Sequence, residues 1–314
     1  MSTTAPETGT APVAARPVQQ VGDRVFASLA MYAGVLILVV LAGVAAFLIA
    51  EALPALAAPA EELPGGQNLF AYIAPLVFGT ILSAAIALIV ATPLAVAVAL
   101  FITHFAPPRV AQTLGYLVDL LAAVPSIVYG LWGIFVLGPA AVSVMQWLED
   151  NLGFIPLFKG PASVTGRTML VAGLVMAVMI IPIVSAVARE VFTQTPRRLQ
   201  EGAIALGATR WEMIRMAVLP FGKSAIISGS MLGLGRALGE TMAVAIILSV
   251  SGVVTFNLIS QSNPSTIAAN IALQFPESSG LDINTLVASG LVLFAITLVV
   301  NMAARAIIGR TNVQ

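Results

Sequence analysis

Residues 195–220 read TPRRLQEGAIALGATRWEMIRMAVLP, a polar, arginine-bearing segment between long apolar runs. Thr195 precedes Pro196, and this pair is typical of a helix start: a hydroxyl accepts hydrogen bonds from free amides, and proline loses no bond at the first helical position. Gly207 is expected to end the helix, since glycine readily adopts the backbone that terminates one. The pattern therefore predicts a short helix followed by a glycine elbow.

A second short helix is expected after the elbow. Thr209 and Glu212 have the spacing of a capping box, in which two side chains satisfy backbone donors at a helix start. This helix should stop before Pro220, because proline cannot extend the hydrogen-bonded ladder. The segment could be a solvated connection, but it has enough apolar positions to suggest a surface that a partner covers: Ala203, Ala205, Leu206, Trp211, Ile214 and Val218.

The composition is that of an integral membrane protein. Of the 314 residues, 59% are hydrophobic and 9% are charged, far below the roughly 25% charged content of soluble domains. Spanning a bilayer takes about 20 apolar residues, and six runs approach or exceed that length. The first run is too long for the core of a signal peptide and is expected to be a retained anchor. The predicted spans are Val25–Ala50, Ile73–Ile102, Leu117–Leu137, Met169–Ala188, Ala225–Val250 and Leu286–Met302.

The spans form one expected all-α membrane domain over residues 25–310. Residues 1–24 have too little apolar content to fold and are expected to form a disordered cytoplasmic tail, and residues 311–314 form a short cytoplasmic end. Prolines inside three spans predict kinked helices whose freed carbonyls are satisfied by neighbouring helices: Pro93, Pro125 and Pro182. One of the longer outer connections has a candidate surface helix at Val142–Leu152.

The basic residues predict the orientation. Most of the 14 lysines and arginines lie in alternate connections: the tail, the turn with Arg109, the loop from Arg189 to Lys223, and the end after Met302. The remaining connections carry only Lys159 and Arg167. Because basic residues collect on the cytoplasmic side, both termini and the segment at 195–220 are expected inside the cell.

Two charges lie well inside the fifth apolar run. Arg236 and Glu240 are costly at that depth, so they are expected to face the protein interior or a wet path. On a continuous helix Gly229 and Gly233 would share one narrow face with the two charges. The glycines would then let a neighbouring helix approach closely. The two charges would lie in line with this helix–helix contact or with a cavity beside it.

The two charges could simply form an ion pair within the helix, although arginine ahead of glutamate is the weaker order. An ion pair that only stabilised helix packing would be unusual, because replacing a buried ion pair with apolar side chains often leaves a protein as stable or more stable. A functional role is therefore favoured. Arg236 is suited to hold a tetrahedral oxyanion through its fork of donors, and Glu240 could hold Arg236 when no anion is present. Asp119, in the third run, is a possible second partner.

No catalytic, metal or cofactor site is expected. The chain has no cysteine, and its single histidine, His104, has no second histidine with which to share a metal. Gly222-Lys223-Ser224 has the ending of a phosphate-binding loop, but Ala217 stands where the first glycine of that loop belongs. The equal numbers of basic and acidic residues mean that the net charge indicates no particular partner, and no nucleic-acid partner is expected.

The loop resembles a known family. Glu201-Gly202-Ala203, Gly207 and Leu219-Pro220 are similar to the EAA loop in the membrane subunits of ATP-binding-cassette importers. The sequence departs from the usual loop at Gly202, where alanine is common, and at Ala217, where a larger aliphatic residue is common. In this family the loop forms a pair of short coupling helices, so the resemblance implies a coupling loop over residues 193–222 seated on a cytoplasmic ATPase.

Two further motifs resemble the phosphate-specific permeases of the CysTW, or binding-protein-dependent, permease family. The Thr-Met-Ala-Val ending of the second motif is more similar to the PstC type of subunit than to the PstA type. The family often has a Gly-Asn pair soon afterwards, where this chain has Leu248-Ser249. The likeness extends from about Val25 to Arg310. The motifs are Pro125-Ser126-Ile127-Val128-Tyr129-Gly130 and Arg236-Ala237-Leu238-Gly239-Glu240-Thr241-Met242-Ala243-Val244.

The resemblance implies the type I ABC importer permease fold in a bacterial inner membrane. It implies a heterodimer with a PstA-type permease, two PstB-type ATPase subunits that bind ATP and Mg, and an external PstS-type phosphate-binding protein. The chain itself would bind no cofactor and carry no catalysis; Arg236 and Glu240 would line the phosphate path. The residues expected in the pathway or at a helix interface are Pro125, Ser126, Tyr129, Gly130, Gly229 and Gly233.

Other functions remain open at this point. A permease for molybdate, sulfate or phosphonate would have the same organisation. An ion-coupled secondary transporter with Glu240 as a proton site, or a channel, would need no docking loop. An intramembrane enzyme is the least favoured, because the sequence has no evident nucleophile and base.

Overall fold

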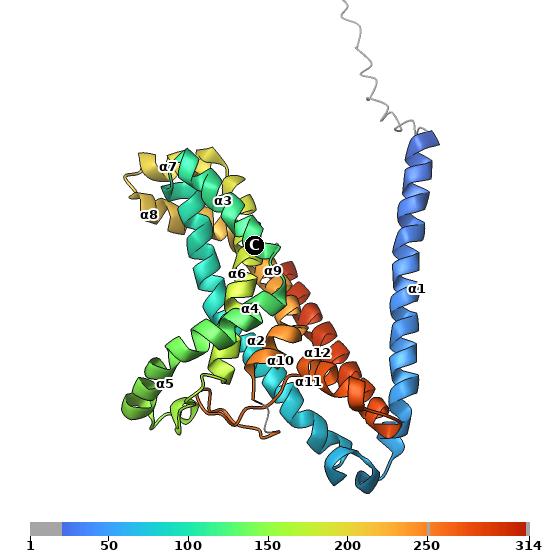
Figure 1. The fold of residues 1–314 in the computed structure, drawn as a ribbon. Helices are drawn as coiled ribbons and strands as arrows, with labels where there is room; N and C mark the ends of the chain where they lie inside the picture. The colour runs from blue at the N-terminus through green and yellow to red at the C-terminus, as the bar shows by residue number, and fades with distance from the viewer. Residues whose placement is uncertain (1–20, 250–251, 312–314) are drawn as a thin grey trace, which may run out of the picture. The chain divides into compact units, whose positions relative to one another are not determined.

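The structure, a computed structural model, describes residues 21–249 and 252–311, and every regular element within these ranges is helical (Figure 1). The chain divides into two units, Met1–Phe47 and Leu48–Gln314. Helix α1 (Val21–Ala57) begins in the first unit and ends in the second. The predicted tail over residues 1–24 therefore overlaps a helix from residue 21, and its first 20 residues lie outside the described ranges. Thr311 is likewise the last residue of a helix, and residues 312–314 of the predicted end are not described.

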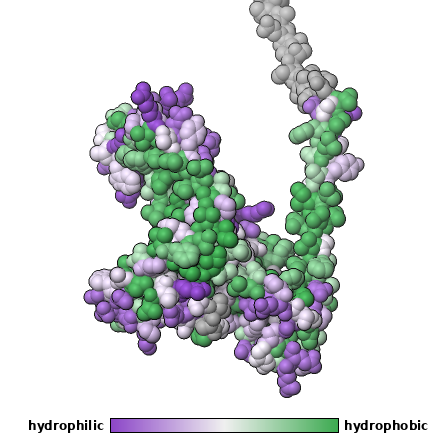
Figure 2. Space-filling view, in the orientation of Figure 1, coloured by the Kyte–Doolittle hydropathy of each residue, from purple (hydrophilic) through white to green (hydrophobic). Residues whose placement is uncertain are grey.

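Six helical stretches in the described residues are long and apolar enough to cross a membrane, as the sequence predicts. The second unit is hydrophilic at two ends and apolar between them (Figure 2). The spans are Val21–Ala57, Leu69–Phe105, Ser126–Leu152, Met169–Thr193, Arg210–Leu238 and Leu281–Ala306. The chain is a multi-pass membrane protein.

The longest connections between the α-helices after α1 are residues 153–168 and 248–266. Asn68 and Thr168 cap the second and fourth spans, accepting from the amides of Ala71 at 2.7 Å and Val171 at 3.3 Å. Three π-helical turns lie at Phe101–Phe105, Gly133–Leu137 and Ile214–Val218. The α-helices are α2 (Leu69–Leu100), α3 (Pro108–Ala122), α4 (Ser126–Trp132), α5 (Gly138–Leu152), α6 (Met169–Thr193), α7 (Arg197–Ala205), α8 (Arg210–Met213), α9 (Leu219–Leu238), α10 (Met242–Ile247), α11 (Ile267–Gln274) and α12 (Leu281–Thr311).

The third span differs from the prediction over Leu117–Leu137. A break at Ala123–Pro125 divides that range, because a residue before proline is driven out of the helical region. Residues 117–122 belong to α3, a separate helix before the span. The span itself runs through α4, a π turn and α5 to Leu152. The helix expected at Val142–Leu152 is present, but as the end of this span and not as a surface helix.

Helix α6 is the most buried of the spans and lies at the centre of the largest hydrophobic cluster. It packs against α2 and α9, and small residues permit the close approach. On α9, a Cβ added to Gly229 would lie 3.1 Å from Cβ of Val187, and one added to Gly233 would lie 3.2 Å from Cγ2 of Val184. The expectation that these glycines admit a neighbouring helix is confirmed, and the neighbour is α6.

Candidate functional site

The fifth apolar run is broken where its charges lie. Helix α9 ends at Leu238 and α10 begins at Met242, so the continuous helix predicted over Ala225–Val250 is wrong. Glu240 lies in the break and is only 8% exposed. Its Oε1 accepts from the backbone amide of Ala243 at 3.1 Å. A carboxylate at this position satisfies a free amide of α10 and is favoured by the positive end of the helix dipole.

Arg236 lies in the last turn of α9 and is partly buried. Its Nε is buried and has no hydrogen-bond partner within the described ranges. Nor does Arg236 form an ion pair with Glu240, since the single ion pair in residues 21–249 and 252–311 joins Arg189 to Asp119. The intrahelical pair considered from the sequence is therefore not formed. A partly buried guanidinium with an unused donor at a helix break is a suitable contact for an anion.

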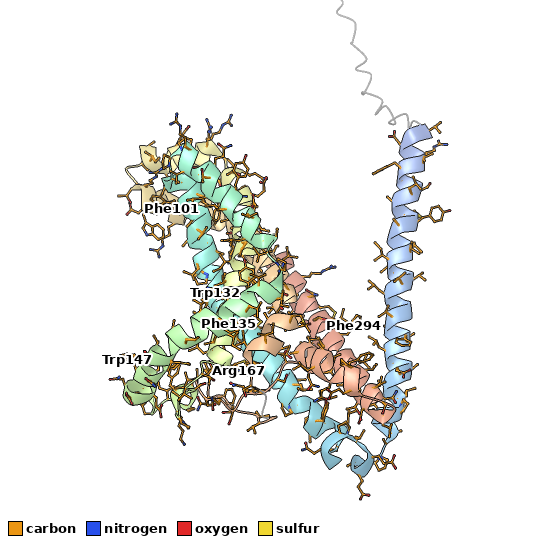
Figure 3. The ribbon with its side chains drawn as sticks, viewed as in Figure 1. Phe101, Trp132, Phe135, Trp147, Arg167 and Phe294 are labelled. Carbon is orange, nitrogen blue, oxygen red and sulfur yellow. The ribbon has the colours of Figure 1, made fainter. Side chains whose placement is uncertain are left out.

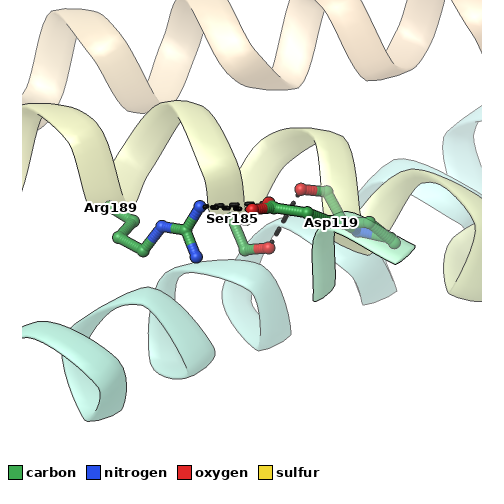
Figure 4. Close-up of polar contacts among 4 residues, drawn as sticks. Asp119, Ser185 and Arg189 are labelled. Atoms are coloured by element: carbon green, nitrogen blue, oxygen red, sulfur yellow. Dashed lines mark hydrogen bonds and ion pairs between the residues drawn. The ribbon is translucent and has the colours of Figure 1, made fainter. Parts of the chain in front are cut away.

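The sequence offered Asp119 as a possible second partner of Arg236, but the structure pairs Asp119 with Arg189 instead. Its carboxylate accepts from Nη2 of Arg189 on α6, at 3.0 and 3.2 Å (Figure 4). Asp119 belongs to α3, outside the third span.

The motif at residues 125–130 packs against the break. Pro125 precedes α4, which contains Ser126, Tyr129 and Gly130. The hydroxyl of Tyr129 donates to the carbonyl of Leu121 at 2.8 Å and so ties α4 to the end of α3. A Cβ added to Gly130 would lie 2.8 Å from Cα of Ala243 on α10. The two motifs that carry the family resemblance are thus in direct backbone contact beside Glu240.

This contact predicts the effect of enlarging Gly130. In Gly130→Ala the new methyl group would meet the backbone of α10, which cannot rotate away as a side chain could. Overpacking of this kind costs about 1–3 kcal/mol, so we expect a lower unfolding temperature for the purified protein. Gly235→Ala is the matched control, because a Cβ at Gly235 has nothing within 4 Å; an equal loss in both variants would contradict the prediction.

Arg167 lies at the other end of α10 (Figure 3). Its guanidinium donates to the carbonyls of Ile246, Ile247 and Leu248 at 3.4–3.5 Å. A cation near the last carbonyls of a helix is favoured by the helix dipole. The sequence placed Arg167 in an outer connection without a role. Its partners lie about 80 residues away in the chain, and no local pattern reports such a contact.

The segment at residues 195–220, the inner loop of the predicted topology, follows α6. Helix α7 contains Glu201 and Gly202, both exposed, and Ala203, which packs on a cluster around Phe192 and Ile214. Pro196, not Thr195, precedes α7. The Thr195 side chain caps nothing, and its hydroxyl is buried with no hydrogen-bond partner in the described part of the chain. The predicted cap at Thr195 is therefore wrong.

The glycine elbow and the second helix start are confirmed. Gly207 has φ +86°, a backbone that favours glycine. Thr209 and Glu212 form the expected capping box, with the amide of Thr209 donating to Oε2 of Glu212 at 2.8 Å. The helix does not stop before Pro220, however. It continues through the π turn at Ile214–Val218 into α9, with Leu219 and Pro220 in the first turn of α9.

The outer face of this loop is apolar at several positions. Leu199 is 51% exposed, Ile204 is 54% exposed, and Leu206 at the elbow is 90% exposed. Hydrophilic side chains gather around them over α7 and α8 (Figure 2). Exposed apolar side chains with polar neighbours are typical of docking surfaces. Within residues 21–249 and 252–311, no three His, Cys, Asp or Glu side chains are grouped to hold a metal.

Known proteins are similar to this chain in sequence. A family model described as "Binding-protein-dependent transport system inner membrane component" matches residues 92–313. A Mycobacterium tuberculosis protein named phosphate transport system permease protein PstC 2 is 44% identical over 306 residues, covering 94% of each chain. A Xylella fastidiosa protein named phosphate transport system permease protein PstC is 41% identical over 251 residues, 78% of this chain and 76% of its own.

Two solved structures share the fold at low sequence identity. A chain of the inward-facing MetNI methionine ABC transporter has a TM-score of 0.52 and 13% identity, and the match covers 77% of this chain and 95% of that one. A chain of a bacterial ABC transporter that imports alginate has a TM-score of 0.55 and 16% identity, with coverage of 76% and 79%. The fold is therefore that of the type I ABC importer permeases, and the chain belongs to the family of binding-protein-dependent transport system inner membrane components.

Proposed function

We propose that this chain is the membrane-spanning permease subunit of an ATP-driven phosphate importer and forms half of the translocation path. The phosphate assignment is supported by relatives of 41–47% identity that are named phosphate transport permeases. The observation that carries the mechanism is Arg236, a partly buried guanidinium with a free donor beside the helix break. Arg236 contacts the anion transiently, because a tight site in a pathway would trap its substrate.

In the proposed complex this chain assembles with other subunits. A PstA-type permease forms the other half of the path, two PstB-type ATPases bind ATP and Mg, and a PstS-type external protein delivers phosphate. The chain is not catalytic and binds no cofactor. Its inner loop, with Glu201, Gly202 and Ala203, sits on an ATPase subunit. The distribution of basic residues supports a cytoplasmic position for both termini and this loop.

Uptake into proteoliposomes tests the proposal. The complete complex, with the external binding protein, should take up labelled phosphate only when ATP is supplied on the ATPase side. Unlabelled phosphate should compete, and molybdate, sulfate and phosphonate should not. Stronger competition by one of those anions would assign the chain to that anion. Uptake that persisted without the ATPase subunits and collapsed with an ion gradient would identify a secondary transporter.

A further inference from the structure

Helix α3 is held against α6 by one ion pair. Nη2 of Arg189 donates to both carboxylate oxygens of Asp119, at 3.0 and 3.2 Å (Figure 4). The two side chains are 25% and 52% exposed, respectively. Helix α3 lies between the second and third spans and is not itself one of the spans.

The surface of α3 leaves space for the Arg189 guanidinium at Gly115. A Cβ added to Gly115, one turn before Asp119, would lie 2.5 Å from Nη1 of Arg189. The guanidinium therefore rests over the glycine, and any larger residue there would displace it. Glycine weakens a helix interior, so its presence in α3 fits a requirement for space beneath the arginine.

Arg189 is directly connected to the inner loop. It lies in the last turns of α6, which ends at Thr193, and α7 begins at Arg197. Phe192 in the same turn belongs to the cluster on which Ala203 of α7 packs. Contacts through this cluster therefore link α7 to the end of α6 that carries Arg189.

Asp119 is connected to the helix break. Two residues beyond it, the carbonyl of Leu121 accepts from the hydroxyl of Tyr129 at 2.8 Å. Gly130, next to Tyr129, contacts the backbone of Ala243. The amide of Ala243 in turn donates to the carboxylate of Glu240 at 3.1 Å. An unbroken series of contacts thus runs from α6 through α3 and α4 to Glu240.

We propose that Arg189 and Asp119 are positioning residues that carry the movement of the inner loop through α3 to the break at Glu240. This inference rests on the proposed function, since it assigns a step of ATP-driven transport. A partly exposed ion pair contributes little to stability, so it can break and reform within a transport cycle. Neither residue touches the transported anion.

A mutant cycle tests the coupling in the complete complex. We expect Asp119→Asn and Arg189→Gln each to lower the anion transported per ATP hydrolysed by roughly 3- to 10-fold. Complex assembly and ATP hydrolysis should persist. If both act through one contact, the double variant should be no worse than either single variant. Arg189→Lys, which keeps the charge, should recover part of the loss.

The control for this cycle is Glu190→Gln. Glu190 neighbours Arg189, but its carboxylate accepts from Gln194 on the same stretch of chain, so its loss should leave transport per ATP unchanged. Single variants that transport normally would overturn the inference. Additive losses in the double variant would overturn it as well.

A distance measurement separates this inference from the proposed function. The chain contains no cysteine, so Thr113→Cys on α3 and Glu190→Cys on α6 introduce its only sites for spin labels. Cysteines in the partner subunits are replaced, so that the measured distance is the one between these two helices. Both positions are exposed. The distribution of distances between the two labels should differ between the nucleotide-free and the ATP–vanadate-trapped complex. In the nucleotide-free complex, Asp119→Asn should shift this distribution towards that of the trapped complex.

An identical distance in both states would overturn the inference. The measurement does not depend on which anion is carried. A complex that transports another oxyanion would contradict the proposed substrate while leaving this result intact.

Discussion

Replacing Arg236 with methionine is expected to abolish phosphate uptake while the complex still assembles. Methionine keeps an unbranched apolar stem, and because Arg236 has no ion-pair partner in the described residues, its loss leaves no opposite charge unpaired. Loss of a preorganised donor to an oxyanion costs about 100-fold or more in the rate of an enzyme reaction, and we expect a loss of that order in uptake. Labelled phosphate uptake and ATP hydrolysis by the purified complex measure the two effects separately.

Two variants make this experiment specific. Arg236→Lys keeps the charge but not the fork of donors, so it should retain intermediate uptake. Arg109→Met removes an exposed arginine at the start of α3 and should transport normally. Normal uptake by Arg236→Met would show that this arginine has no part in the path.

A glutamate in place of Leu206 should prevent the ATPase subunit from binding. Leu206 is 90% exposed, so the change removes little packing within the chain and should not affect folding. At the centre of a docking surface, the substitution would bury a charge in an apolar contact. Loss of a hot-spot residue at the centre of an interface costs about 2 kcal/mol or more, roughly 30-fold in affinity, and co-purification of the ATPase subunit measures the loss.

Phe154→Glu is the matched control for the docking surface. Phe154 is 82% exposed and follows α5, at the end of the third span away from α7 (Figure 1). This variant should retain the ATPase subunit. If Leu206→Glu co-purified with the ATPase as well as the control does, the coupling role of the loop would have to be abandoned.

The features that the sequence predicted are those set by local chemistry. Six apolar runs, the capping box of Thr209 and Glu212, and the left-handed Gly207 each depend on a few neighbouring residues. The glycine face of α9 follows from helical periodicity alone. Family motifs then located the loop and the region of Arg236 without any knowledge of packing.

The features that the sequence did not predict depend on contacts between distant segments. The break at Glu240 lies in a run with no proline, and α4 packs on α10 directly after it. Arg189 lies 70 residues from Asp119 in the chain. The helix continues through Pro220 directly after a π turn. The sequence has no periodic pattern that predicts such a turn.

The uninterrupted helix from Arg210 to Leu238 has a mechanical consequence. Its 29 residues form a rod about 43 Å long at 1.5 Å per residue. A π turn and Pro220 lie near the foot of this rod, and the residues from Phe221 to Arg236 continue as helix with no further proline, so this part of the rod is expected to move as one stiff unit. Glu240 lies beyond the tip of the rod, so in the proposed complex a movement of the rod would change the separation between the arginine and the carboxylate.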